Sequence, residues 1–227
     1  MAIKIKYQLD ENSIKYNNFR EIKRLTNYND IVYINCNNNQ LTKLPSILPA
    51  SLQKLDCYYN ELIELPSKLP DSLQVLECSA NQLTELPSDL PASLQVLECS
   101  RNQLTELPSD LPISLQELFC SNNHLTKLPS NLPGSLQNLT CYYNELTELP
   151  SNLHELRNLY YINYSNNQIE YIPPHITRFL NRLIDTNRTK IYDDGQNVHN
   201  HQIQESIRNS VFVAINTDTR TKHAKHG

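Results

Sequence analysis

The chain has 227 residues, of which 20 are Lys or Arg and 24 are Asp or Glu, so its formal net charge is −4. This balance gives no bulk attraction to nucleic acid or to an anionic membrane, and we expect neither as a partner. Residues 1–7 lack the apolar core of a signal peptide, and no run approaches the roughly 18 apolar residues of a membrane span. A cytoplasmic protein is expected.

The first 30 residues do not repeat and are predicted to form an N-terminal cap. Ile14, Phe19, Ile22 and Leu25 fall near helical spacing after a polar cluster at residues 10–13 that suits a helix N-cap. We therefore expect a short amphipathic helix that covers the open end of the following sheet. A helix that recruits a partner is the alternative.

From residue 31 the chain repeats with a period of 21. Six cysteines mark the period, and each is followed three residues later by an asparagine. They are Cys36, Cys57, Cys78, Cys99, Cys120 and Cys141, with Asn39, Asn60, Asn81, Asn102, Asn123 and Asn144. A seventh unit has Tyr164 in the cysteine position and Asn167 after it. A constant period near 20 residues indicates a solenoid.

Each unit predicts one short strand. The alternation of Leu97 and Cys99 has a period of two, which places both side chains inward. Stacked units would pair these strands into a parallel sheet, with about 4.8 Å between neighbours. The asparagine amide both donates and accepts, so it can satisfy backbone groups where the chain leaves the sheet. We interpret the asparagine column as structural.

The six cysteines share one inward position, where a free thiol behaves as a small hydrophobe. Neighbouring side chains would point the same way in register, which suits packing better than a disulfide. Reduced, packed thiols indicate a cytosolic setting. Metal binding and redox chemistry are the less favoured alternatives.

The segments between strands carry two prolines each, such as Pro87 and Pro91. Proline opposes a helix and favours an extended, polyproline-like connector. Only residues 152–159 depart from this form, being two residues longer, and a helical turn fits there.

The unit Leu-x-x-Leu-x-Cys-x-x-Asn-x-Leu-x-x-Leu-Pro resembles the leucine-rich repeats over residues 31–173, as seven repeats. It is similar to the short class, about 21 residues, of secreted bacterial effectors and giant viruses of amoebae. The resemblance implies an α/β solenoid with a parallel β-sheet on the concave face, extended convex connectors and helical caps at both ends. It also implies a protein-binding role, in the host cytosol if the origin is viral.

Beyond the repeats, Ile176, Phe179, Leu180 and Leu183 have helical spacing and predict a C-terminal capping helix within residues 174–188. Residues 189–227 form a tail, with a possible second helix over residues 201–215. No cysteine follows Cys141, so the nucleophile of a ubiquitin-ligase domain is absent, and the tail is too short for one. Its histidines lack ligand spacing. We expect no enzyme activity, metal or cofactor.

Candidate binding residues lie on the concave face, where the inter-repeat variation is greatest. Three stacked carboxylates lie beside apolar side chains and are framed by tyrosines, a composition common at interfaces. The candidates are Lys54, Asp56, Tyr58, Tyr59, Val75, Glu77, Val96, Glu98, Arg101, Phe119, Tyr142 and Tyr143. Duplicated repeats also inherit exposed residues without selection for a ligand, as another column shows (Glu64, Glu85, Glu106 and Glu148).

Two functions follow from this pattern. The first is a non-enzymatic scaffold that binds a basic protein partner through the concave face. The alternative is a substrate-recognition adaptor whose tail, residues 189–227, recruits an enzyme such as a ubiquitin ligase. Neither function fixes the oligomeric state.

Overall fold

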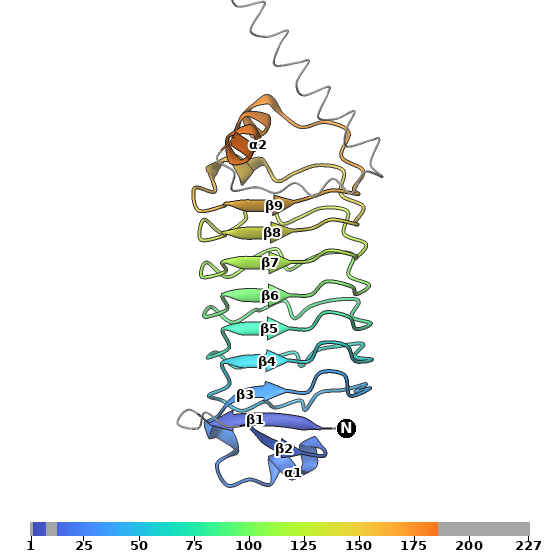
Figure 1. Ribbon diagram of the computed structural model, residues 1–227, viewed down its shortest axis with the longest axis vertical. Helices are drawn as coiled ribbons and strands as arrows, with labels where there is room; N and C mark the ends of the chain where they lie inside the picture. The colour runs from blue at the N-terminus through green and yellow to red at the C-terminus, as the bar shows by residue number, and fades with distance from the viewer. Residues whose placement is uncertain (1, 8–12, 186–227) are drawn as a thin grey trace, which may run out of the picture.

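Residues 2–7 and 13–185 are described by a computed structural model (Figure 1). The tail from residue 189, with its predicted second helix, lies outside the described residues. None of the helices in the described part is long and apolar enough to cross a membrane.

One nine-stranded sheet runs the length of the molecule in the order β2-β1-β3-β4-β5-β6-β7-β8-β9. The strands are β1 (Ile3–Tyr7), β2 (Ile14–Tyr16), β3 (Ile31–Asn35), β4 (Lys54–Asp56), β5 (Val75–Glu77), β6 (Val96–Glu98), β7 (Glu117–Phe119), β8 (Asn138–Thr140) and β9 (Tyr161–Asn163). From β3 to β9 all pairs are parallel, so the seven predicted repeats are stacked as expected. Figure 1 shows them as successive turns of a solenoid.

The core consists of columns of identical side chains. Leu76, Leu97 and Leu118 lie side by side in the register, and all three are fully buried, as are the six cysteines. Each leucine removed from water contributes about 1.5–3 kcal/mol. The predicted inward alternation of leucine and cysteine is therefore confirmed, and the fold class is a leucine-rich repeat solenoid.

The asparagine column bridges neighbouring repeats, as predicted. The Asn102 Oδ1 atom accepts a hydrogen bond from the Leu83 amide at 3.0 Å. Its Nδ2 atom donates to the carbonyls of Cys78, 3.1 Å away, and Cys99, 3.0 Å away. Because both carbonyls and the amide are buried in the turn of the chain, the side chain satisfies groups that water cannot reach.

A second column, of serines, performs the same task on the connector side. The Ser93 hydroxyl lies 2.7 Å from the carbonyls of both Asp71 and Leu73 in the preceding repeat. Equivalent bridges are formed by Ser72, Ser114 and Ser135. This bridging role was not predicted from the sequence, although these serines recur every 21 residues.

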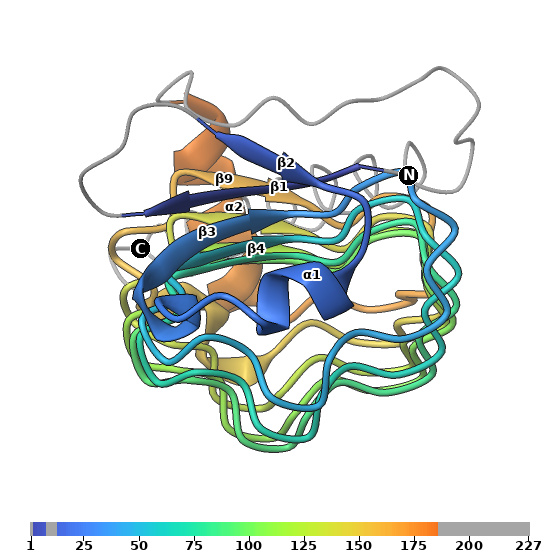
Figure 2. The same cartoon turned by 90° about the horizontal axis from the view of Figure 1, so that it is seen from below.

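The N-terminal cap differs from the prediction of a single helix. Ile14 lies in β2, Phe19–Lys23 form the helix α1, whose N-cap is Asn18, and Tyr28–Asp30 form a 3₁₀ turn, η1. The edge of the parallel sheet is covered by β1, which pairs antiparallel with β3 and with β2 (Figure 2). The alternation of Ile3 and Ile5, both fully buried, was the strand signal that helical spacing obscured.

Helical structure closes the other end. A 3₁₀ turn, η2 (Ser151–Glu155), occupies the longer connector, and α2 (Pro174–Asp185) follows the last repeat. Ile176, Phe179 and Leu180 of α2 are buried. The connectors between β4 and β8 contain no helix, which agrees with the two prolines in each.

Candidate functional site

The predicted residues gather on the outward face of β4 to β7, which we call the strand-face patch. Lys54, Val75, Val96 and Glu117 are register neighbours in one column, and Asp56, Glu77, Glu98 and Phe119 are neighbours in the next. The 21-residue period therefore stacks like positions on adjacent strands. Sequence alone could place these columns because no residue is inserted between repeats.

Asp56 is not an exposed carboxylate, contrary to the prediction. Only 7% of its surface is accessible, and its Oδ2 atom accepts from the Asn35 amide at 2.7 Å and the Asn37 amide at 3.2 Å. The Tyr58 backbone N–H donates to Oδ1 at 3.2 Å. Burial raises the pKa of this carboxyl, although the Tyr58 hydrogen bond opposes the shift. Its contacts are internal, so little of it is left for a partner.

Glu77 is paired within the patch. The Lys54 Nζ atom lies 2.7 Å from Glu77 Oε1, one strand away and diagonal to it in the register. Burial lowers the pKa of Lys54, but the hydrogen bond and charge of Glu77 outweigh this effect and leave the pKa raised. The pair neutralises one of the three stacked carboxylates.

Glu98 and Glu117 are the carboxylates that remain. Within residues 2–7 and 13–185, neither has an ion-pair or hydrogen-bond partner for its side chain. Burial, and then the charge of Glu77, raise the pKa of Glu98. The two carboxylates lie diagonally on β6 and β7, with Val96 and Phe119 on the other diagonal. Acidic and apolar side chains therefore alternate both along and across these two strands.

The tyrosines frame the patch where the strands end. The rings of Tyr58 and Tyr59 lie 6.0 Å apart between centroids, and those of Tyr142 and Tyr143 lie 5.7 Å apart. Tyr59, Arg101 and Tyr143 occupy one position in their repeats, with φ between 52° and 56°. This left-handed backbone turns the chain out of the sheet, and Arg101 lies exposed between the tyrosine pairs.

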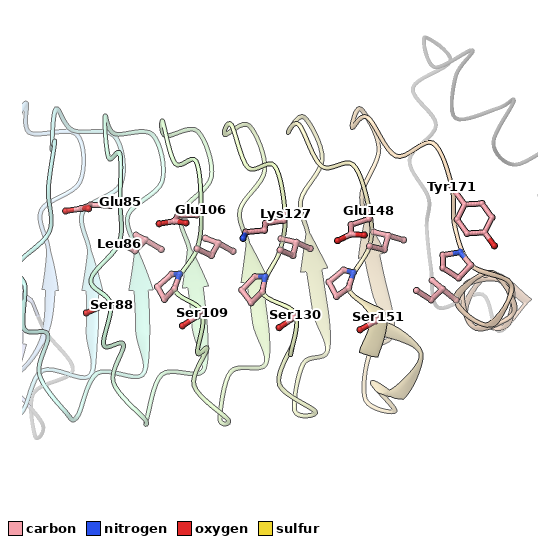
Figure 3. Close-up of a pocket in the computed structure, with 18 of the residues that line it drawn as sticks. Glu85, Leu86, Ser88, Glu106, Ser109, Lys127, Ser130, Glu148, Ser151 and Tyr171 are labelled. Carbon is pink, nitrogen blue, oxygen red and sulfur yellow. The ribbon is translucent and has the colours of Figure 1, made fainter.

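A second surface was not selected by sequence reasoning. A groove of about 700 Å³ lies on the connector side, with the strands behind it (Figure 3). We call it the connector groove. Its floor is formed by Leu-Pro pairs at successive repeats, and one rim carries Glu85, Glu106, Lys127 and Glu148. At one end lie Tyr171 and Pro173 of the last repeat, with His175 and Ile176 of α2.

The cysteines offer no reactive site. Burial raises the pKa of Cys99 to about 12, with a further contribution from Glu98, and raises the pKa of Cys141 to about 12. A thiol that remains protonated and buried is a poor nucleophile and metal ligand. In the described part of the chain, no three His, Cys, Asp or Glu side chains are grouped as metal ligands.

Comparisons with known proteins agree with this architecture. The family model described as Leucine Rich Repeat matches residues 114–134. No curated protein matches the sequence. Among solved structures, the leucine-rich repeat domain of a Shigella effector is 33% identical, with a TM-score of 0.54. The match covers 70% of this chain and 80% of that domain.

Two further structures are similar. YopM from Yersinia enterocolitica is 41% identical with a TM-score of 0.56, and the match covers 62% of this chain but only 30% of YopM. The functional domain of InlJ from Listeria monocytogenes, described as including a cysteine ladder, is 28% identical with a TM-score of 0.52. There the match covers 65% of this chain and 38% of that domain.

The fold and these matches define a class of protein: a short-repeat solenoid of the kind found in bacterial effectors. The chain belongs to the leucine-rich repeat family. Proteins of this family generally bind other proteins.

Proposed function

We propose that this chain is a non-enzymatic interaction scaffold that binds a basic protein segment across the strand-face patch. The observation that carries the proposal is the position of Glu98 and Glu117 beside Val96 and Phe119, with no cation within 4.0 Å of either carboxylate among the described residues. Phenylalanine and tyrosine are enriched at protein interfaces, and carboxylates beside them give electrostatic complementarity to a basic partner.

The charge distribution favours a partner with lysine or arginine at one place. Asp56 is buried among amide donors and Glu77 is paired with Lys54, so Glu98 and Glu117 are the carboxylates of the patch that stay open to a cation in the described part of the chain. A basic side chain placed there would also cover Phe119 with its aliphatic stem. Relief of the repulsion between neighbouring carboxylates adds to the attraction.

The dimensions favour a peptide segment or a small domain. The tyrosine pairs are four repeats apart, which is about 19 Å at the usual strand spacing. The patch is at most about 17 Å wide from strand to tyrosine turn, since the five steps from Lys54 to Tyr59 cover roughly 3.3 Å each when extended. The resulting area is smaller than the roughly 800 Å² that each partner buries in a standard interface between two globular proteins.

The test is a double charge reversal, Glu98→Lys with Glu117→Lys. We expect the captured partner to associate at least tenfold more slowly at low salt, and this difference to shrink as salt screens the charges. Asp89→Lys with Asp110→Lys changes the net charge equally on exposed connectors and serves as the control. Equal loss of binding in both variants would place the interface elsewhere.

Glu77 is a less informative choice for this test because its reversal would also break the pair with Lys54.

Deletion of residues 189–227 distinguishes the scaffold function from the adaptor function. A scaffold retains its partner and its cellular effect after the deletion. An adaptor retains the partner and loses the effect.

A further inference from the structure

The net charge has opposite signs in residues 1–185 and residues 186–227. Residues 186–227 contain six Lys or Arg and four Asp or Glu, a net charge of +2. Because the whole chain has −4, residues 1–185 have a net charge of −6. Residues 220–227 include Arg220, Lys222 and Lys225 and no acidic side chain. The basic end of the chain is thus attached to an acidic solenoid.

The connector groove has the features that would bind such a segment. Its floor is apolar, since it is lined by Leu107, Leu128 and Leu149 and the prolines that follow them, although each leucine is largely buried. Glu85, Glu106 and Glu148 are exposed along one rim, where Figure 3 shows them in line. In the described part of the chain, none of these three carboxylates has a cation within 4.0 Å.

The aromatic end of the groove adds a second attraction. Tyr171 is 66% exposed beside the last repeat, although most large side chains of the solenoid are covered. A lysine or arginine over a tyrosine ring is attracted by the ring quadrupole. Tyr171 belongs to the last repeat, in the column of Glu106 and Glu148, and lies close to the start of α2, at Pro174.

The spacing of the charges also matches. Glu106 and Glu148 are two repeats apart, which is about 9.6 Å at the usual strand spacing. Lys222 and Lys225 are three residues apart, and an extended or polyproline-like chain covers about 9–10 Å in three residues. Lys127 lies between the two glutamates, and His223 and Ala224, between the two lysines, would lie opposite it.

We propose that the basic segment 220–227 docks in the connector groove of its own chain, with Lys222 at Glu106 and Lys225 at Glu148. Arg220 would then lie towards Glu85, one repeat further from α2. This contact is distinct from the strand-face patch, so it leaves the proposed partner surface open.

The length of the intervening chain permits binding within one molecule. Between Asp185 and Arg220 lie 34 residues, which can span up to about 110 Å. Nine stacked strands occupy only about 40 Å. A tethered segment acts at an effective concentration of up to about a millimolar, so a millimolar affinity of the groove for the segment would keep it bound in about half of the molecules.

Paramagnetic labelling of the full chain tests the proposal. Ala224→Cys introduces one thiol, and the six native thiols are buried, so a nitroxide label would attach at residue 224. We expect the amide signals of Ser109, Ser130 and Ser151 to lose more than half of their intensity in the oxidised form. Glu106→Lys with Glu148→Lys should restore these signals, and so should high salt.

Charge exchange distinguishes the specific contact from general attraction. In the Glu106→Lys, Glu148→Lys background, Lys222→Glu with Lys225→Glu should bring the signal loss back to the groove. Glu98→Lys with Glu117→Lys on the strand face is the matched control and should leave the groove signals attenuated.

Full signal intensity in the groove of the chain labelled at residue 224, equal attenuation on both faces, or no recovery on charge exchange would each overturn the proposal. None of these readouts involves the partner. Their failure is therefore separate from failure of the strand-face function.

Discussion

The Lys54 Nζ atom and the Glu77 Oε1 atom are 2.7 Å apart across neighbouring strands, diagonal in the register. Their contact makes the strand-face column unequal, because one carboxylate is neutralised while its neighbour Glu98 is not. A column that is regular in sequence is thereby irregular in charge.

This pair gives the first prediction. Lys54→Met should cost about 0.3–1 kcal/mol of unfolding free energy at low ionic strength, and less in high salt, because the pair is partly exposed. Urea denaturation at two salt concentrations measures the difference. Lys43→Met is the control, since Lys43 lies 3.6 Å from Glu64 and both side chains are mostly exposed. An equal effect at both sites would show that burial adds nothing to the Lys54 pair.

The second prediction concerns how the Glu98 carboxyl makes the stability of the protein depend on pH. Burial and the charge of Glu77 raise its pKa in the folded state, so the ionised carboxyl opposes folding. Glu98→Gln should therefore stabilise the protein at pH 7 by a few tenths of a kcal/mol, given its partial exposure. The gain should be present above the folded-state pKa and vanish as pH falls through it towards the unfolded value, about 4.3. Stability curves of both proteins between pH 3 and 8 test the sign, and a gain that grows on acidification would contradict it.

The asparagine column gives a prediction in stability. Asn102→Ala leaves the Leu83 amide and two cysteine carbonyls without partners, and should cost about 1–3 kcal/mol. Asn102→Asp should cost more at pH 7, because a carboxylate would face the same two carbonyls. Gln103→Ala, at an exposed neighbour, is the control in chemical denaturation. A loss of only a few tenths for Asn102→Ala would mean that water reaches these backbone groups.

Thiol reactivity gives a fourth prediction. All six cysteines are free and fully buried, and the pKa of Cys99 is raised to about 12 by burial. A disulfide reagent at pH 8 should react slowly with the native protein and label six thiols quickly in denaturant. Rapid native labelling of several thiols would show that the strands open readily or that the register is different.

Arg101 gives a fifth prediction, which links stability to binding. Its φ is 56°, and the same position is asparagine in three other repeats, as at Asn122. Because asparagine tolerates the left-handed region better, Arg101→Asn should stabilise the fold by up to about 1 kcal/mol. It should also weaken binding if this side chain contacts the partner. Thermal unfolding and the dissociation constant are the two measurements, and Ala80→Asn is the control for strain alone, with φ of 54°.

The repeat explains which features the sequence could predict. The inward positions of Leu97 and Cys99 and the bridging role of Asn102 each recur with an unbroken period, so one unit determines the others. The columns of the strand-face patch follow from the same register.

The remaining features depend on contacts that the period does not contain. The Lys54–Glu77 pair is diagonal, and the burial of Asp56 depends on Asn35 and Asn37 from the first repeat alone. At the N-terminus, two strands of five and three residues compete with a helical pattern that is equally short. Antiparallel pairing with the sheet edge decided the outcome there, and it is a tertiary effect.

The bridges formed by asparagine and serine connect each repeat only to its neighbours, so a middle repeat contains nothing that specifies its rank in the stack. Removing or duplicating one 21-residue unit between β5 and β7 should therefore re-form every bridge. The distance between the two tyrosine pairs would change by about 4.8 Å, the spacing of one strand. The length of the binding surface between the tyrosine pairs can thus be changed in steps of one repeat, while the core packing of every repeat stays the same.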